Sequence, residues 1–205
     1  MKTLLLATRN EDKISEISEA LSGLPIELKS FKDFPQLPEV QETGKTLFEN
    51  AFLKARAFYL ASGLPTLADD TGLEIITLAG QPGVFSSRFA GPEATYAENV
   101  AKALEMMQGI KGRDRKATFR CVIALVFSPT DERYVEGTLE GTITTAPIGK
   151  GGFGYDPIFY VPALEKTLAE LSLEEKNEIS HRGRALVKVR QVLRDWSEKN
   201  APKFV

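Results

Sequence analysis

The sequence has one cysteine and one histidine among its 205 residues. A single cysteine excludes an internal disulfide and a redox CxxC pair, and one cysteine with one histidine cannot complete a structural zinc site. A Ser-His-Asp or Cys-His centre would have to use His181, the only imidazole in the chain. If the protein is an enzyme, carboxylates, cations or a hard metal ion must therefore do most of its chemistry.

Long apolar segments and a strong charge of one sign are also missing. The longest apolar run, residues 121–127, is far shorter than the ~20 residues of a membrane span. The run at 4–7 is too short for the apolar part of a signal peptide. A net charge of −2 and a pI near 5.7 argue against a non-specific nucleic-acid binder, which usually carries a basic face. We therefore expect a cytoplasmic protein without a nucleic-acid or membrane partner, although a local cationic pocket for a small anion stays open.

The remaining composition suits one soluble domain of mixed helices and strands. A chain of this length buries roughly 70% of its unfolded surface, so its core needs no crosslink. Apolar patterning predicts strands at 3–8, 64–68 and 73–78, and a hairpin of 117–127 with 134–144 joined by several residues. Capping residues predict helices after Asn10, Thr46, Thr95, Ser172 and Ser180. We expect an α/β fold with a mixed sheet flanked by helices, in a single domain over residues 1–205.

Two nucleotide-binding motifs occur only in part. Residues 149–154 match GxGxxG, but the residues after them read as extended chain, whereas a dinucleotide site needs a helix there. Gly44-Lys45-Thr46 resembles the end of a P-loop, but the position that requires the first glycine holds Glu39. We interpret Gly44 as the end of a loop and Thr46 as a helix cap.

The segment TRNEDK at 8–13 lies where a strand meets a helix. Backbone N–H groups at such a helix start favour anions, and Thr8, Asn10 and Lys13 could add hydrogen bonds and charge. The alternative is that Thr8 or Asn10 only caps the helix while Lys13 is solvated. Local chemistry leaves both interpretations open.

Adjacent carboxylates follow the apolar run at 64–68. Asp69 and Asp70 would point to opposite sides of an extended chain, so one of them should face a given pocket. A carboxylate there could hold Mg²⁺ and orient or deprotonate a water molecule, and Glu42 or Glu39 could supply a second one. The alternatives are an Asp-rich turn through Thr71 and ordinary surface charge on the glutamates.

Two further segments carry candidate binding residues. In the glycine-rich stretch 151–157, Phe153 could stack on a flat ligand, or the aromatic residues could pack into the core. In the segment 176–182, a cap at Ser180 would place His181 and Arg182 in the first helical turn. Cations there oppose the helix dipole, so an anion or acceptor should compensate unless both side chains are solvated.

Six segments occur together in a fixed order: TRNEDK (8–13), EN (49–50), ADDTGL (68–73), PGVFSSRF (82–89), GGFGYDPIF (151–159) and EKNEISHR (175–182). This set resembles the inosine triphosphate pyrophosphatase family, also called XTP/dITP diphosphatases, from about residue 4 to residue 193. The resemblance implies a long twisted mixed sheet in two lobes with a central cleft, Mg²⁺ as cofactor, and a homodimer. It implies hydrolysis of non-standard purine nucleoside triphosphates (ITP, dITP and XTP) to the monophosphate and pyrophosphate.

The resemblance also implies residue roles. Asp70 is expected to be the catalytic residue that binds metal and activates water, with Asp69 in support, and Glu42 to be the other metal ligand, with Glu39 as its rival. Purine contacts fall to Lys176, His181 and Arg182. The full set of expected substrate-binding residues is Thr8, Arg9, Asn10, Glu11, Asp12, Lys13, Thr71, Phe153, Gly154, Tyr155, Asp156, Lys176, His181 and Arg182.

These roles give a simple logic for base selection. Hypoxanthine and xanthine present an oxygen acceptor at position 6, where adenine presents an amino donor. Donors from Lys176, His181 and Arg182 suit the oxygen and would be left unpaired against adenine. Two positions depart from the common pattern of the family, Arg9 in place of a small residue and Thr71 in place of serine, and Thr71 keeps the hydroxyl. A related pyrophosphatase for other modified nucleotides, and a nucleotide sensor or RNA-binding module, are the alternatives.

Overall fold

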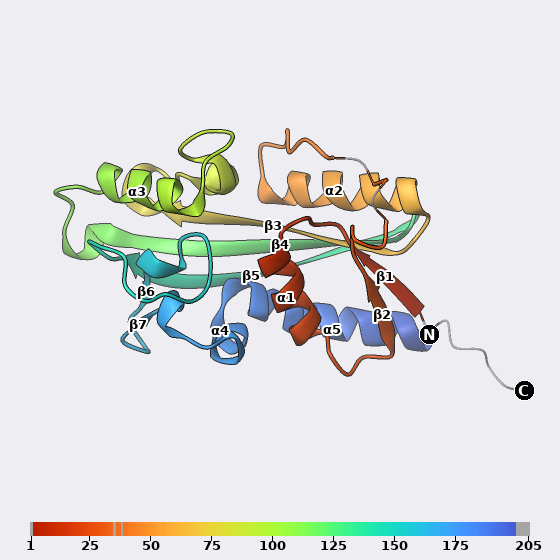
Figure 1. Ribbon diagram of the computed structural model, residues 1–205. Helices are drawn as coiled ribbons and strands as arrows, with labels where there is room; N and C mark the ends of the chain where they lie inside the picture. The colour runs from red at the N-terminus through yellow and green to blue at the C-terminus, as the bar shows by residue number, and fades with distance from the viewer. Residues whose placement is uncertain (1, 35, 38, 200–205) are drawn as a thin grey trace, which may run out of the picture. The chain divides into compact units, whose positions relative to one another are not determined.

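The computed structural model describes residues 2–34, 36–37 and 39–199. It contains strands and helices in mixed order along the chain (Figure 1). The strands are β1 (Lys2–Leu6), β2 (Ile26–Lys29), β3 (Thr66–Ile75), β4 (Lys116–Ser128), β5 (Asp131–Ile143), β6 (Phe159–Val161) and β7 (Lys166–Thr167). The α-helices are α1 (Glu11–Ala20), α2 (Leu47–Ser62), α3 (Tyr96–Met106), α4 (Leu173–Ile179) and α5 (His181–Lys199).

The strands form one sheet in the order β2-β1-β3-β4-β5-β6-β7. β1 pairs in parallel with both β2 and β3, whereas β6 pairs antiparallel with β5 and β7. Only two residues separate β4 from β5, and so short a connection between neighbouring strands requires an antiparallel hairpin. The predicted α/β class with a mixed sheet is therefore confirmed.

Contacts divide the chain into two compact units. Unit 1 comprises the chain up to Asp70, residues 122–136 and the chain from Gly183 onward. In unit 1, α2 lies on one side of the strands, and α1 and α5 lie on the other (Figure 1). Arg190 of α5 donates to the Ala20 carbonyl at 2.6 Å, which fastens α5 to the end of α1. Unit 1 therefore has the layered build of a helix–sheet–helix fold.

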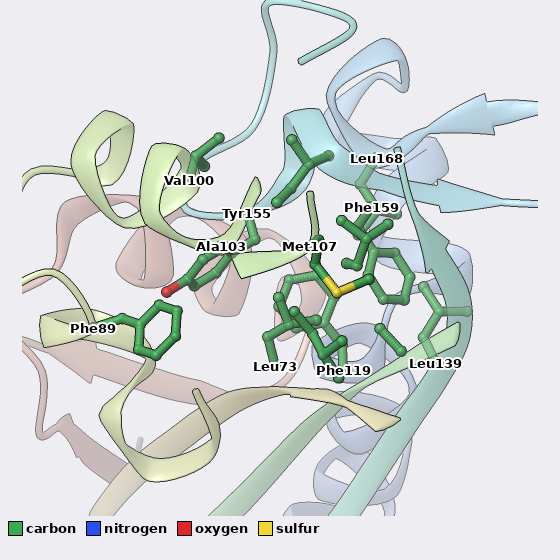
Figure 2. Packing of buried hydrophobic residues seen from close by; sticks show 14 of the residues in the cluster. Leu73, Phe89, Val100, Ala103, Met107, Phe119, Leu139, Tyr155, Phe159 and Leu168 are labelled. Carbon is green, nitrogen blue, oxygen red and sulfur yellow. The ribbon is translucent and has the colours of Figure 1, made fainter. Parts of the chain in front are cut away.

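Unit 2 comprises residues 71–121 and 137–182. Its core lies between α3 and the strands, where Figure 2 shows side chains of α3, β3, β4 and β5 packed together with those of the segment 155–168. Met107, Ile158 and Phe159 have no exposed surface there. The core side chains labelled in Figure 2 are Leu73, Phe89, Val100, Ala103, Met107, Phe119, Leu139, Tyr155, Phe159 and Leu168. The predicted single two-lobed domain with a central cleft stays a prediction.

A buried arginine binds backbone carbonyls beside this core. The Arg115 guanidinium donates to the carbonyls of Ile143 (2.6 Å), Met107 (3.0 Å), Ile110 (3.0 Å) and Thr144 (2.5 Å). Replacing Arg115 by methionine keeps bulk but removes all four of these hydrogen bonds, so we expect a loss of about 3 kcal/mol in unfolding free energy, measured by urea denaturation. The exposed Arg113→Met is the matched control, and equal losses in the two variants would contradict the assigned role.

One sequence prediction is wrong in an informative way. The predicted strands at 64–68 and 73–78 form a single strand, β3, and residues 76–78 form a 3₁₀ turn. Asp69 and Asp70 therefore lie inside a strand rather than in a turn. Both side chains form ion pairs within unit 1, and such tertiary contacts outweigh the low strand propensity of aspartate.

Other boundaries differ less. The hairpin connection is shorter than predicted, β1 ends at Leu6 instead of residue 8, and β2 has no counterpart in the predicted elements. All five predicted helices are present, and the residues after the GxGxxG segment form a short 3₁₀ turn and β6, as expected for a chance match. No helix in the described part of the chain is both long and apolar enough to cross a membrane.

Candidate active site

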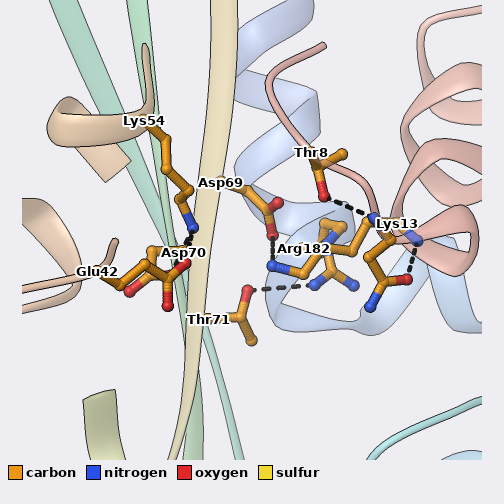
Figure 3. Close-up of polar contacts among 9 residues, drawn as sticks. Thr8, Lys13, Glu42, Lys54, Asp69, Asp70, Thr71 and Arg182 are labelled. Carbon is orange, nitrogen blue, oxygen red and sulfur yellow. Dashed lines mark hydrogen bonds and ion pairs between the residues drawn. The ribbon is translucent and has the colours of Figure 1, made fainter. Parts of the chain in front are cut away.

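The connection from β1 to α1 forms a tight polar turn. Asn10 caps α1, and its side chain accepts from the Lys13 backbone N–H at 3.1 Å. The Thr8 hydroxyl accepts from the Asn10 backbone N–H at 3.2 Å, which holds the start of the turn (Figure 3). The predicted helix cap at Asn10 is confirmed, and the turn has the local form that suits an anion.

The charged neighbours in this turn have contacts elsewhere. Arg9 donates to the Leu37 carbonyl at 2.9 Å, and its guanidinium carbon lies 5.6 Å from the centre of the Phe31 ring. Glu11 forms an exposed ion pair with Lys32 at 2.9 Å. Asp12 is exposed in the first turn of α1. Substrate contacts by Arg9, Glu11 and Asp12 stay predictions.

Asp69 and Asp70 point to opposite sides of β3, as their consecutive positions in an extended chain predict (Figure 3). The Asp69 carboxylate pairs with the Lys13 ammonium at 3.0 Å, and its side chain is fully buried. Asp69 thereby links β3 to the polar turn, while Asp70 belongs to a separate cluster on the other side. The expectation that only one of the two carboxylates serves a given pocket agrees with this arrangement.

That cluster has Lys54 of α2 at its centre. The Lys54 ammonium donates to Glu42 at 2.6 Å and to Asp70 at 2.7 Å. Burial alone would lower the pKa of Lys54, but attraction from Asp70, Glu42 and Asp69 outweighs burial and raises this pKa above its usual value. Burial raises the pKa of Asp70, and repulsion from Glu42 adds to this effect, while Lys54 and Lys13 oppose it. Lys54 therefore stays positively charged. The Asp70 carboxylate binds a proton more readily than an exposed aspartate does.

Sequence reasoning missed Lys54, although a signal was present. The predicted apolar stripe of α2 includes Leu47, Ala51, Ala55 and Phe58, and Lys54 lies three residues after Ala51 on the same face. A lysine on the inward face of a helix needs a buried partner. The sequence of α2 therefore indicates a carboxylate near the middle of this helix. In the structure, Asp70 and Glu42 are these carboxylates.

The donor set of this cluster fits a hard divalent cation. One oxygen of Glu42 and one of Asp70 both contact the Lys54 ammonium, so the two carboxylates lie close together. Mg²⁺ is typically bound by one or two carboxylates with its other ligands from water or phosphate. Among the described residues, no group of three or more Asp, Glu, His or Cys side chains is arranged to hold a metal. Glu39 is exposed, so the geometry favours Glu42 over Glu39 as the second carboxylate.

A second group of predicted residues lies in unit 2, around the loop at 151–156. The buried Asp156 carboxylate accepts from the Phe153 backbone N–H at 2.9 Å and from the Lys176 ammonium. Gly152 has a positive φ of 66°, and a Cβ at this position would collide with the Asp156 carboxylate. Glycine is therefore required for the loop to fold over Asp156, which explains the glycine-rich sequence.

Two cations lie against the Phe153 ring. The Lys176 ammonium is 4.5 Å from the ring centre, and the Arg182 guanidinium carbon is 5.4 Å from it, both within the range of a cation–π contact. Arg182 also donates to the Thr71 hydroxyl at 3.2 Å. Lys176 and Arg182 are almost fully buried, which rules out the alternative of a solvated arginine. Thr71, Phe153, Asp156, Lys176 and Arg182 thus form one connected group.

The remaining predicted substrate-binding residues of unit 2 make contacts with the protein core or its backbone. His181 begins α5 and is buried with its ring stacked on Phe119, at 4.5 Å between ring centres. The Tyr155 hydroxyl donates to the Ser86 carbonyl at 2.9 Å, and burial raises the pKa of Tyr155. This tyrosine belongs to the core of unit 2, so any substrate contact would come from its backbone. Gly154 has a positive φ of 61° in the same loop.

Comparisons with known proteins agree with the resemblance seen in the motifs. The family model of the Ham1 family matches residues 4–192. A protein of Geobacter sulfurreducens named dITP/XTP pyrophosphatase is 50% identical over 91% of this chain and 94% of its own. One of Coxiella burnetii with the same name is 48% identical over 94% of this chain and 97% of its own.

Solved structures give the same result. A HAM1 protein from Coxiella burnetii has a TM-score of 0.87 at 47% identity and covers 95% of this chain and 100% of its own. The Staphylococcus aureus Ham1 protein has a TM-score of 0.84 at 36% identity over 95% of this chain and 99% of its own. A family match over nearly the whole chain, with relatives this similar in sequence and fold, establishes that the chain belongs to the Ham1 family.

Proposed function

We propose that this protein is a Mg²⁺-dependent pyrophosphatase that hydrolyses ITP, dITP and XTP to the nucleoside monophosphate and pyrophosphate. It thereby removes deaminated purines from the nucleotide pool. The observation that carries the proposal is the Glu42–Lys54–Asp70 cluster, in a chain whose relatives are named dITP/XTP pyrophosphatases. The homodimer and the cytoplasmic location stay predictions.

The cluster in unit 1 suits the phosphate chemistry. Asp70 and Glu42 would hold Mg²⁺, which supplies positive charge when bound and stabilises the charge that develops on the phosphates. In this proposal, the Asp70 carboxylate also takes the proton of the attacking water. Lys54 keeps the two acidic side chains together and offsets their charge.

The polar turn supports the same substrate. Thr8 and Asn10 order the start of α1, where backbone N–H groups favour phosphate. Lys13 is held beside β3 by Asp69 and carries an ammonium that offsets phosphate charge. In this proposal, the α-phosphorus is attacked by water and pyrophosphate leaves.

The second group suits a base with an oxygen at position 6. Lys176 and Arg182 are buried donors held by Asp156 and Thr71, so their positions are preorganised. The Phe153 ring lies beside both cations, and in this proposal the purine stacks on it. Adenine would meet buried donors with its own amino donor, and a mismatch of this kind discriminates strongly.

A substrate panel tests the proposal. With Mg²⁺ present, we expect ITP, dITP and XTP to be cleaved with a kcat/KM at least ~100-fold above that for ATP. The products should be a monophosphate and pyrophosphate, identified by chromatography, and removal of divalent metal with EDTA should abolish turnover. Orthophosphate as the first product, or equal turnover of ATP, would refute the proposal, and nucleotide binding without turnover would point to a sensor.

A further inference from the structure

Helices α2 and α3 begin with the same pattern, Thr-x-x-Glu-Asn. In α2 the Thr46 hydroxyl caps the helix by accepting from the Glu49 backbone N–H at 3.1 Å. In α3 the Thr95 hydroxyl caps the helix in the same way. The asparagines that follow, Asn50 and Asn99, are 0% and 2% exposed. The two helix starts therefore allow a direct comparison of two buried asparagines in one local setting.

Asn99 uses both ends of its side-chain amide. Its oxygen accepts from the Ala90 backbone N–H at 2.8 Å, and its nitrogen donates to the Ser87 carbonyl at 3.0 Å. The amide thus fastens the segment before α3 to the helix, and both its oxygen and its nitrogen have a hydrogen-bond partner. A role in stability explains Asn99 without further assumption.

Asn50 uses only one end. Its oxygen accepts from the Gly44 backbone N–H at 2.7 Å. Its nitrogen is buried and has no hydrogen-bond partner among residues 2–34, 36–37 and 39–199. A buried donor without an acceptor costs about 1–3 kcal/mol, so this arrangement is worse for stability than that of Asn99. Residues that break a local rule in this way are expected at functional sites.

The position of Asn50 suggests what it does. Gly44 follows Glu42 by two residues, and Lys54 follows Asn50 by one turn of α2. The bond between Asn50 and Gly44 therefore joins the segment that carries Glu42 to the helix that carries Lys54. The contact is close, since a Cβ on Gly44 would lie 2.6 Å from the Asn50 oxygen and 2.7 Å from Cβ of Glu49.

We propose that Asn50 is a positioning residue of the acidic cluster. By holding Gly44 against α2, it sets the place of Glu42 beside Lys54 and Asp70, and so sets the affinity of the cluster for a divalent cation. This inference rests on the proposed function only in that it takes Glu42 and Asp70 as the carboxylates that hold metal.

Binding of Mn²⁺ to the full, substrate-free chain tests this inference, with electron paramagnetic resonance reporting the free ion. We expect Asn50→Ala to raise the Kd for Mn²⁺ roughly 10- to 100-fold, the usual effect of removing a residue that orients a metal ligand. Gly44→Ala should act in the same direction, because its Cβ collides with α2. This second variant keeps the test decisive if Asn50→Ala does not fold.

Two comparisons separate positioning from stability. Asn99→Ala is the matched control and should destabilise the protein to urea while leaving the Kd for Mn²⁺ unchanged. Asn50→Ala combined with Glu42→Gln should bind Mn²⁺ no more weakly than Glu42→Gln alone, because Asn50 acts through Glu42. The Mg²⁺ concentration for half-maximal ITP hydrolysis should rise in Asn50→Ala, with little change in the KM for ITP.

The possible outcomes are distinct. An unchanged Kd in Asn50→Ala, fully additive effects with Glu42→Gln, an equal shift in Asn99→Ala, or no Mn²⁺ binding by the wild type would each overturn the inference. If ITP is not hydrolysed but the Mn²⁺ results are as expected, the proposed function fails and the positioning role stands. If ITP is hydrolysed but Asn50→Ala leaves the Kd for Mn²⁺ unchanged, the positioning role fails and the proposed function stands.

Discussion

Replacing Asp70 by asparagine should lower kcat for ITP roughly 10²- to 10⁴-fold, the range expected for loss of a general base. Asparagine keeps the size of the side chain but cannot take a proton and is a poor ligand for a hard cation. The bond from Lys54 can persist because the amide oxygen still accepts. Steady-state kinetics at saturating Mg²⁺ and ITP measures the effect. Near-normal turnover would remove Asp70 from both assigned roles.

The same substitution should not unfold the protein. Burial raises the pKa of Asp70, so the folded state holds this proton more tightly than the unfolded chain does. Such a carboxyl group stabilises the fold below its unfolded pKa, and this stability is lost as pH rises through the higher folded pKa. With metal removed by EDTA, Asp70→Asn removes this burial cost but also removes a counter-charge of Lys54, so the variant should stay folded at neutral pH. Its stability should fall less steeply than that of the wild type as pH rises.

Urea unfolding at several pH values measures this dependence. Asp131→Asn is the matched control, because Asp131 pairs with Arg133 on a more exposed part of unit 1. This control should keep the turnover of the wild type. A large loss of stability in Asp70→Asn at neutral pH would mean that the pairing with Lys54 outweighs the cost of burial.

The fold was largely predictable because its elements carry local signals. Capping residues such as Asn10, Thr46 and Thr95 mark helix starts, and the structure has helices at each of them. The failure lies at β3, where Asp69-Asp70-Thr71-Gly72 has the composition of a turn. The ion pairs from Lys13 and Lys54, which are remote in sequence, compensate the buried carboxylates and favour a strand there.

The candidate site shows the same division between local and remote information. Consecutive positions in a strand were enough to predict that Asp69 and Asp70 point apart. The choice between Glu42 and Glu39 was open, because it depends on where an irregular segment places each side chain. Here the bond from Asn50 to Gly44 joins that segment to α2, and no spacing in the sequence predicts it.

The loop at 151–156 provides the second prediction with a large expected effect. Lys176→Met removes the ammonium that pairs with Asp156 and leaves a buried carboxylate with the Phe153 N–H as a donor. Removing one partner of a buried ion pair typically costs about 3–5 kcal/mol. We therefore expect a loss of this size in unfolding free energy, together with a loss of preference for ITP over ATP. Urea denaturation and the ratio of kcat/KM values for ITP and ATP measure the two effects.

A double variant separates these effects. In Lys176→Met with Asp156→Asn, the remaining side chains are neutral, and the asparagine oxygen can still accept from the Phe153 N–H. Replacing a buried ion pair by neutral groups is often close to neutral for stability, so most of the lost free energy should return. The preference for ITP should not return, because the donor expected to meet the oxygen at position 6 is still absent. A double variant that regains the preference would show that Lys176 supports the loop alone, and Arg182 would then be the donor that selects the base.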